Sequence, residues 1–224
     1  MEQQAEHFHP KAVILDMDGL MLDTERPVLE LWTIAGRNFG QEIPAEMTMR
    51  LIGTNDAGTR ALFFNEYGNN FPYEKIRQET ERLMAEKLER EGIALRPGLI
   101  TLLDYLAGRN IPFAVATSTD RKTALWKLEK AGIRERFSLM VCGDEIKNGK
   151  PAPDIFLAAA GRLGVSPAGC AGFEDSAPGL RGLYAAEIRS VFIKDLVEPP
   201  PEVLATVWRQ YRDLEEALAI FGTV

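Results

Sequence analysis

Residues 11–24, KAVILDMDGLMLDT, decide the fold of this chain. The run 12–15 is apolar, contains β-branched residues and is too short for a buried helix. It therefore predicts a strand buried on both faces, as in parallel sheets. Two carboxylates, Asp16 and Asp18, follow this strand and precede Gly19. Ligands of open α/β sheets bind beyond the carboxyl ends of the strands, which makes the acidic pair a candidate site. The alternative is an acidic turn that merely closes a strand, because Asp and Gly are common in turns.

The composition is typical of a globular, acidic protein. The 224 residues are 46% hydrophobic, enough for a sizeable core, and carry a formal net charge of -7. This charge disfavours nucleic acids and anionic membranes as partners. No apolar run approaches the length of about 20 residues that spans a bilayer, and residues 1–10 lack the apolar core of a signal peptide. Cys142 and Cys170 lie in strand-like segments and predict buried, reduced thiols. We therefore expect a cytoplasmic monomer.

The first half of the chain beyond Asp18 has a helical pattern. Apolar residues recur at helical spacing, and glycines follow the predicted segments. The predicted helices span 25–39, 45–51, 56–67 and 73–91. No strand-like run interrupts them.

From Arg96 onward, strand-like and helical segments alternate. The predicted strands are 111–117, 139–142, 169–173 and 190–193, and the predicted helices between and around them are 97–108, 120–131, 153–163 and 176–186. Such alternation predicts right-handed crossovers and a parallel sheet. After the prolines at 199–201, the spacing of Trp208, Leu214 and Phe221 predicts a closing helix.

The fold class is therefore α/β. The pattern predicts a Rossmann-like parallel-sheet core from residues 1–23 and 94–224, with an inserted all-helical cap domain at 24–93. Because the insertion follows the strand that ends at Asp16 and Asp18, the helical block lies where a lid over an active site is expected.

Three further stretches place polar side chains after strands. Thr117-Ser118-Thr119 could bind an anion together with helix N-terminal amides, or could cap the next helix with Asp120. Glu174 and Asp175 could be oxygen ligands for Mg²⁺, or Asp175 or Ser176 could cap a helix.

Lys150 lies in the segment 147–154, KNGKPAPD. This segment does not fit a phosphate loop, since Gly143 lies one residue too far back and Pro151 takes the place of the metal-binding Ser or Thr. A surface turn, with Pro153 starting the next helix, is the alternative. Together, however, the four strand-end groups supply a nucleophile, an acid-base group, phosphate ligands, a cation and a metal cage. Those are the groups that phosphoryl transfer requires.

The motifs resemble those of the haloacid dehalogenase-like hydrolases. DMDGLMLDTE (16–25), VATSTD (115–120), KNGKPAPDIF (147–156) and GFEDSAPGL (172–180) are similar to the four family motifs, in order. The nearest subgroup is subfamily I with a helical cap, which includes β-phosphoglucomutase and small phosphomonoester phosphatases. The resemblance covers nearly all of the chain beyond Lys11.

The resemblance implies a role for each motif residue. Asp16 would be the nucleophile and Asp18 the general acid and base, while Thr117 and Lys150 would hold the transferring phosphoryl group. Asp16, Asp18 through its carbonyl, Glu174 and Asp175 would bind Mg²⁺. Further phosphate contacts would come from Gly19, Ser118 and Arg121.

The implied activity is hydrolysis of a small phosphomonoester, a sugar phosphate or a nucleoside monophosphate, through an aspartyl-phosphate. Mutase members carry a His shortly after the first motif and an Arg in the cap, whereas residues 25–28 read ERPV and residues 53–56 read GTND here. Hydrolysis is therefore favoured over a β-phosphoglucomutase-type reaction, which stays an alternative. Asp18 argues against dehalogenation, and inorganic pyrophosphate stays open as a substrate. The alternative from another class is a non-catalytic phospho-acceptor or binding module.

Overall fold

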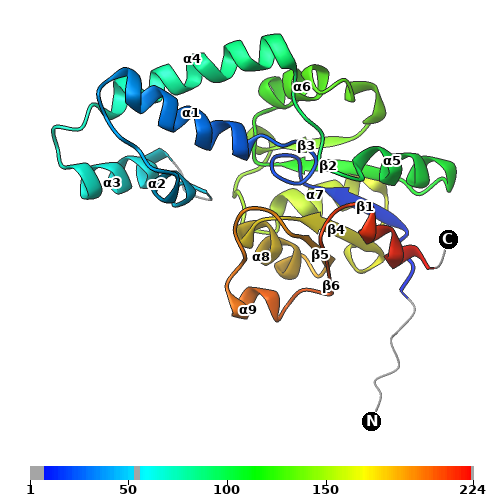
Figure 1. Ribbon diagram of the computed structural model, residues 1–224. Helices are drawn as coiled ribbons and strands as arrows, with labels where there is room; N and C mark the ends of the chain where they lie inside the picture. Colours follow the sequence, from blue (N-terminus) through cyan, green and yellow to red (C-terminus); the bar gives the residue numbers. More distant parts are fainter. Residues whose placement is uncertain (1–7, 53–55, 223–224) are drawn as a thin grey trace. The chain divides into compact units, whose positions relative to one another are not determined.

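The computed structural model describes residues 8–52 and 56–222 (Figure 1). The chain divides into two compact units, Met1–Leu22 with Leu95–Val224, and Asp23–Ala94. These boundaries lie one residue away from those predicted for the core and the inserted block. Within the described ranges, no helix is long and apolar enough to cross a membrane.

The first unit is built on a parallel sheet. In the described part of the chain, six strands pair in the order β3-β2-β1-β4-β5-β6. Their bounds are β1 (Ala12–Leu15), β2 (Phe113–Thr117), β3 (Met140–Cys142), β4 (Cys170–Glu174), β5 (Arg189–Ile193) and β6 (Arg209–Tyr211). Every pairing is parallel, and β1 lies between β2 and β4. The prediction of an α/β fold with a parallel sheet is confirmed.

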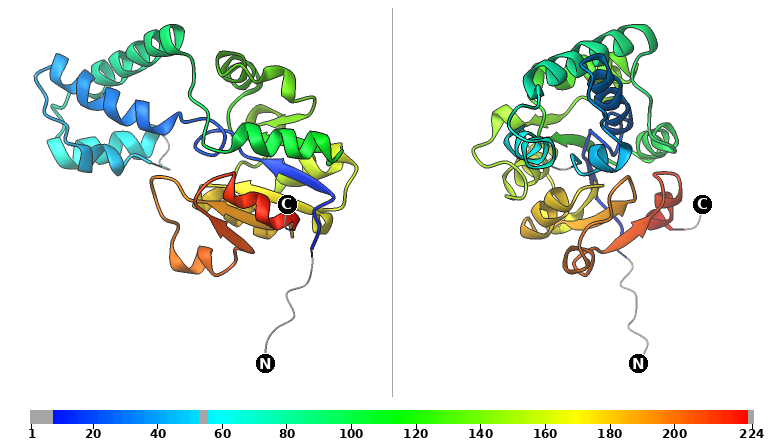
Figure 2. Two further views of the ribbon diagram at one scale, coloured as in Figure 1. Left: turned by 45° about the vertical axis from the view of Figure 1, so that its right-hand side comes forward. Right: turned by 60° about the vertical axis from the view of Figure 1, so that its left-hand side comes forward.

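Helices cover both faces of this sheet. They are α5 (Leu99–Gly108), α6 (Arg121–Lys130), α7 (Asp154–Leu163), α8 (Ala177–Ala185) and α9 (Pro201–Leu204). Figure 2 shows α5 on one side of the sheet and α7 with α8 on the other. On the second side, Ile14 and Val141 of the sheet share a buried cluster with Phe156 of α7 and Leu183 of α8. Short 3-10 turns at Arg134–Arg136, Gly143–Glu145, Pro167–Gly169 and Glu216–Phe221 complete the unit.

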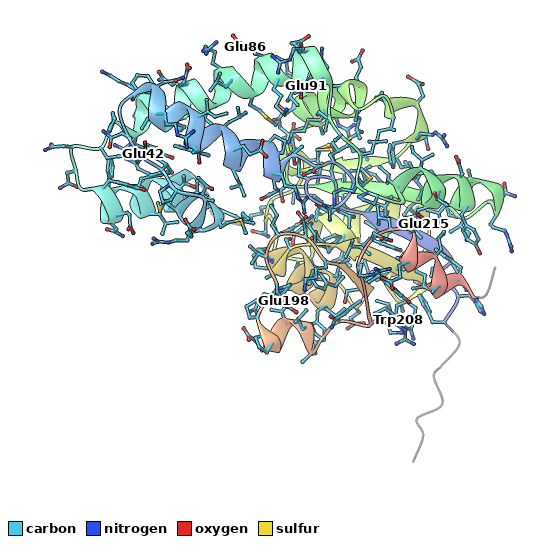
Figure 3. The ribbon with its side chains drawn as sticks, in the orientation of Figure 1. Glu42, Glu86, Glu91, Glu198, Trp208 and Glu215 are labelled. Atoms are coloured by element: carbon cyan, nitrogen blue, oxygen red, sulfur yellow. The ribbon has the colours of Figure 1, made fainter. Side chains whose placement is uncertain are left out.

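The predicted closing helix through Trp208 to Phe221 is wrong. Residues 209–211 form β6, which pairs with β5, and Trp208 donates its backbone N–H to the Ser190 carbonyl at 3.1 Å. Trp208 lies beside this edge of the sheet (Figure 3). Without β6 the outer edge of β5 would have unpaired backbone groups, and strand pairing satisfies them more fully than a separate helix. The apolar spacing did not reveal that edge.

The second unit is helical, as predicted. It contains α1 (Glu25–Asn38), α2 (Ala45–Met49), α3 (Asp56–Tyr67) and α4 (Tyr73–Glu91). Its core is aromatic: the Phe63 ring stacks on Trp32 at 4.7 Å and on Phe71 at 5.0 Å between centroids. The charged face of α4 is solvated, and Figure 3 shows Glu86 projecting from it. Exposed pairs such as Arg82–Glu86 contribute little stability.

Both cysteines are buried and free, Cys142 at the end of β3 and Cys170 at the start of β4. The prediction that both thiols are buried is confirmed.

Candidate active site

Three acidic or hydroxyl side chains meet at the carboxyl edge of the sheet because of strand register. Asp16 follows β1, and Leu15 pairs with Val115 of β2 and with Phe173 of β4. Thr117 and Glu174 are the last residues of those neighbouring strands. The Asp16 backbone N–H also donates to the Phe173 carbonyl at 3.1 Å. All three polar residues are buried, with Glu174 fully inaccessible.

Lys150 reaches this group from the loop between β3 and α7. Its ammonium pairs with Asp16 Oδ1 and with Glu174 Oε1, the latter at 2.6 Å, and donates to the Ala116 carbonyl at 3.1 Å. The Nζ atom lies 5.0 Å from the centre of the Phe156 ring. The Lys150 side chain is only 7% exposed, which does not fit a residue of a plain surface turn. The Lys150–Pro151 peptide bond is cis.

The N-terminus of α8 holds Glu174 in place. Glu174 Oε2 accepts hydrogen bonds from the Ser176 amide at 3.2 Å and from the Ser176 hydroxyl at 2.9 Å. The Ser176 hydroxyl oxygen accepts in turn from the Gly179 amide at 3.1 Å and so caps the helix. Capping therefore falls to Ser176 and leaves the neighbouring Asp175 carboxylate available for another partner.

Asp175 belongs to a group of carboxylates that could hold a cation. Its Oδ1 atom is buried without a hydrogen-bond partner, and one oxygen each from Asp16, Glu174 and Asp175 lie within 4.8 Å of one another. Burial, together with the charges of Glu174, Asp16 and Asp195, raises the pKa of Asp175 well above its usual value. Such a set of hard oxygen atoms fits Mg²⁺. We conclude that these residues fit the metal that the motifs imply.

The electrostatics of Asp16 and Lys150 follow from their burial. Burial raises the pKa of Asp16 to about 7 against the lowering effect of Lys150, and the carboxylates of Glu174 and Asp18 raise it further. Burial acts to lower the pKa of Lys150, but the charges of Asp16 and Glu174 outweigh it and raise the pKa above its usual value. Lys150 is therefore a permanent cation, whereas the Asp16 carboxylate needs a positive neighbour to stay ionised.

Gly19 lies directly against Asp175. Its φ is +83°, and a Cβ atom there would lie 2.2 Å from Asp175 Oδ2. We expect Gly19→Ala to lower the free energy of unfolding by about 1–3 kcal/mol, because a left-handed backbone strains an L side chain. It should also weaken the binding of Mg²⁺ in a titration, because the methyl group would displace one of the carboxylates that fit the metal.

Gly68 provides a matched control for this prediction. Its φ is +82°, but no atom lies within 4 Å of the position that a Cβ would take. Gly68→Ala should therefore lose stability in urea denaturation through backbone strain alone and should not change the binding of Mg²⁺. If Gly19→Ala bound Mg²⁺ as the parent protein does, the contact between residue 19 and Asp175 would not affect metal binding.

The Asp18 carboxylate contacts Thr119 of the second motif and Lys127 of α6. Its Oδ2 atom accepts from the Thr119 hydroxyl at 2.8 Å, and its Oδ1 atom pairs with the Lys127 ammonium at 2.6 Å. This contact of Lys127 was not predicted from the sequence. The signal was present, because Lys127 lies on the same helical stripe as the buried Ala124 and Leu128, where a charged residue needs a partner.

The other polar residues of the second motif bond locally or face solvent. Thr117 Oγ1 accepts from the Thr119 amide at 3.1 Å, and Asp120 caps α6 by accepting from the Thr123 amide at 3.0 Å. Ser118 is exposed at the strand end. Capping by Asp120 leaves the hydroxyls of Thr117 and Ser118 available for an anion.

Arg121 is held away from the carboxylate group. Its guanidinium donates to Glu145 Oε1 at 2.6 Å and to the Met140 carbonyl at 2.8 Å. Glu145 also accepts from Arg162 at 2.7 Å. These contacts connect α6, β3 and α7, so they account for Arg121 without a phosphate.

Glu145 should make stability depend on pH. Partial burial acts to raise its pKa, but hydrogen bonds from Arg162 and Arg121 outweigh it and lower the pKa from 4.5 to about 2. A group with a lowered pKa in the folded state stabilises the fold above its unfolded pKa and loses that effect as the pH falls. Glu145→Gln should therefore unfold more easily than the parent protein near neutral pH.

The difference should shrink between about pH 5 and pH 2, which urea denaturation at several pH values measures. The exposed Glu129→Gln variant on α6 is the control and should match the parent throughout. A gap between Glu145→Gln and the parent that does not depend on pH would contradict the ion pairs as its cause.

Comparisons with known proteins identify the family of this chain. A family model described as haloacid dehalogenase-like hydrolase matches residues 10–187. The phosphorylated carbohydrates phosphatase of Thermotoga maritima is 31% identical over 187 residues, which cover 81% of this chain and 84% of that protein. The beta-phosphoglucomutase of Bacillus subtilis is 30% identical over 223 residues, covering 90% and 97%.

A solved structure shares the fold as well. The family IA haloacid dehalogenase-type hydrolase from Entamoeba histolytica superposes with a TM-score of 0.74 at 25% identity, covering 95% of this chain and 99% of that chain. The matched family model and the named phosphatase relative define the class of the protein as a hydrolase. The chain belongs to the haloacid dehalogenase-like hydrolases.

Proposed function

We propose that the protein is a Mg²⁺-dependent phosphatase that hydrolyses a small phosphomonoester through an aspartyl-phosphate on Asp16. The observation that carries the proposal is the buried ion pair of Lys150 with Asp16 and Glu174, beside the unpartnered Asp175 oxygen. A carboxylate attacks a phosphate dianion poorly because like charges repel, and the Lys150 ammonium offsets that repulsion. The phosphatase name of the Thermotoga relative supports the same activity.

The residues would act in two steps. In the first, an Asp16 oxygen forms a bond to phosphorus while the bond to the ester oxygen breaks, and Asp18 gives its proton to that leaving oxygen. In the second, Asp18 takes a proton from water as the water oxygen attacks phosphorus and the bond to Asp16 breaks. Inorganic phosphate leaves, and Asp16 and Asp18 return to their starting states. Thr117, Ser118 and Lys150 would hold the phosphoryl oxygens throughout.

Asp16, Glu174, Asp175 and the Asp18 carbonyl would hold Mg²⁺, which when bound neutralises charge on the phosphate oxygens. The Asp175 atom without a partner supports this ligand set.

The proposed substrate class is supported by the name of a relative and by the inserted helical unit Asp23–Ala94. The name of the Thermotoga relative supports a sugar phosphate, and a nucleoside monophosphate is the other candidate. The helical unit Asp23–Ala94 enters the chain just after the Asp18 loop, and we propose that it is the cap that selects small esters. We further propose a cytoplasmic monomer acting on a small metabolite.

A phosphosugar mutase is the second candidate, favoured by the Bacillus relative. Residues 25–28 offer no His here, and residues 53–55 of the cap segment lie outside the described residues. Incubation with β-glucose 1-phosphate separates the two: a phosphatase releases inorganic phosphate, whereas a mutase forms glucose 6-phosphate, and ³¹P NMR distinguishes them.

Removal of the metal tests the proposed function directly. With p-nitrophenyl phosphate and Mg²⁺ we expect many turnovers per protein molecule, and EDTA should lower the rate by at least about 10²-fold because the acidic cluster loses its cation. Added Mg²⁺ in excess of EDTA should restore the rate. A single stoichiometric labelling by acetyl phosphate without turnover would instead indicate a phospho-acceptor module. Full turnover in EDTA would contradict the metal-dependent mechanism.

A further inference from the structure

Neither the motifs nor the proposed chemistry gives a role to Lys127, which contacts Asp18. It lies in the middle of α6, half-buried, with its side chain 20% exposed, and pairs with an Asp18 carboxylate that is 25% exposed. The two residues are 109 positions apart in the chain, so the pair depends on the tertiary fold. A surface lysine would gain little from such a pair, and holding the long side chain costs rotamer entropy.

The Asp18 carboxylate is held at both oxygen atoms. Lys127 Nζ lies 2.6 Å from Oδ1, and the Thr119 hydroxyl donates to Oδ2 at 2.8 Å. Two donors on different oxygens fix the plane of the carboxyl group as well as its position. Each oxygen keeps a second lone pair, so a proton can still be accepted there.

The backbone around Asp18 and around its partner Thr119 is also held by hydrogen bonds. The Gly19 amide donates to the Leu22 carbonyl at 2.9 Å, which closes the loop that carries Asp18. On the other side, the Thr119 carbonyl accepts from the Gly143 amide at 3.0 Å. The backbone on both sides of this contact is thus held without Lys127, and removal of Lys127 would free the Asp18 side chain rather than the backbone.

We propose that Lys127 is a positioning residue for Asp18, which with Thr119 holds the carboxyl group in the orientation that delivers its proton to the leaving oxygen. This inference rests on the proposed function, in which Asp18 is the general acid. Proton delivery depends on the alignment of donor and acceptor, so a freely rotating Asp18 would transfer its proton in a smaller fraction of encounters. Binding of the phosphoryl group, which falls to other residues, would be unaffected.

Two aryl phosphates of nearly equal shape test this role. The phenolate of phenyl phosphate is the stronger base and needs a proton to leave, whereas p-nitrophenolate leaves readily without one. We expect Lys127→Met to lower kcat/KM for phenyl phosphate by at least about tenfold and to change kcat/KM for p-nitrophenyl phosphate by less than about threefold. Thr119→Val, which removes the other donor, should show the same selective loss.

The controls separate positioning from folding. Lys122→Met removes an exposed lysine of the same helix and should leave both esters unchanged. Lys127→Met should keep the parent melting temperature within a few degrees, since its side chain is partly solvated. An equal loss on both esters, or no loss on either, would overturn the inference. If Asp16→Asn retained parental turnover, the proposed function itself would fail and this inference with it.

Discussion

Asp16→Asn should abolish turnover. Asn has nearly the same size and shape but carries no nucleophilic carboxylate, so no aspartyl-phosphate can form. We expect kcat to fall by at least about 10⁴-fold, because loss of a covalent nucleophile removes the whole reaction path. A discontinuous phosphate-release assay with p-nitrophenyl phosphate measures the loss, and trapping with a radiolabelled ester should find label on the parent protein alone.

The variant should remain folded. Lys150 keeps its pair with Glu174 at 2.6 Å when Asp16 becomes neutral, so no buried ammonium is left without a partner. Asp104→Asn, at an exposed position of α5, is the control and should keep parental activity. Turnover near the parental level in Asp16→Asn would end the proposed mechanism, whatever the metal dependence.

The sheet could be predicted because its strands carry their signal locally. The run 12–15 and the alternating segments after Arg96 are apolar and short, and fully buried strands need no other context. The failure at Trp208 has a different cause. Whether residues 209–211 form a strand depends on an open edge of β5, which is a property of the assembled sheet and not of that segment. Local spacing therefore could not decide it.

The part of the candidate site that lies at strand ends could be predicted from the sequence. Asp16, Thr117 and Glu174 end adjacent strands, so their proximity follows from sheet order. Lys127 was missed because its partner lies across the fold, and Arg121 was proposed as a phosphate ligand from its place in the motif alone. The structure pairs Arg121, at the start of α6, with Glu145 of the 3-10 turn after β3, a contact across the fold that no local sequence pattern fixes.

Lys150→Met should cost both activity and stability. The ammonium bridges Asp16 and Glu174, and all three side chains are at least nine-tenths buried. Its removal leaves carboxylates in a buried setting with their shared cation gone, which typically destabilises a fold by about 3–5 kcal/mol. We expect kcat to fall by at least about 10³-fold, because nothing then offsets the repulsion between Asp16 and the phosphate. Urea denaturation and phosphate release measure the two effects.

A second substitution separates the two consequences. Glu174→Gln in the Lys150→Met background removes one of the two buried carboxylate charges that have lost their cation. The Gln side-chain oxygen can still accept the two hydrogen bonds that Ser176 donates to Glu174. Neighbouring charges couple, so the double variant should be more stable than Lys150→Met alone rather than additively worse. Its activity should stay as low, since the cation for the phosphate is still absent. If the double variant were less stable than either single variant, the buried ion pair would not be what Lys150 contributes to the fold.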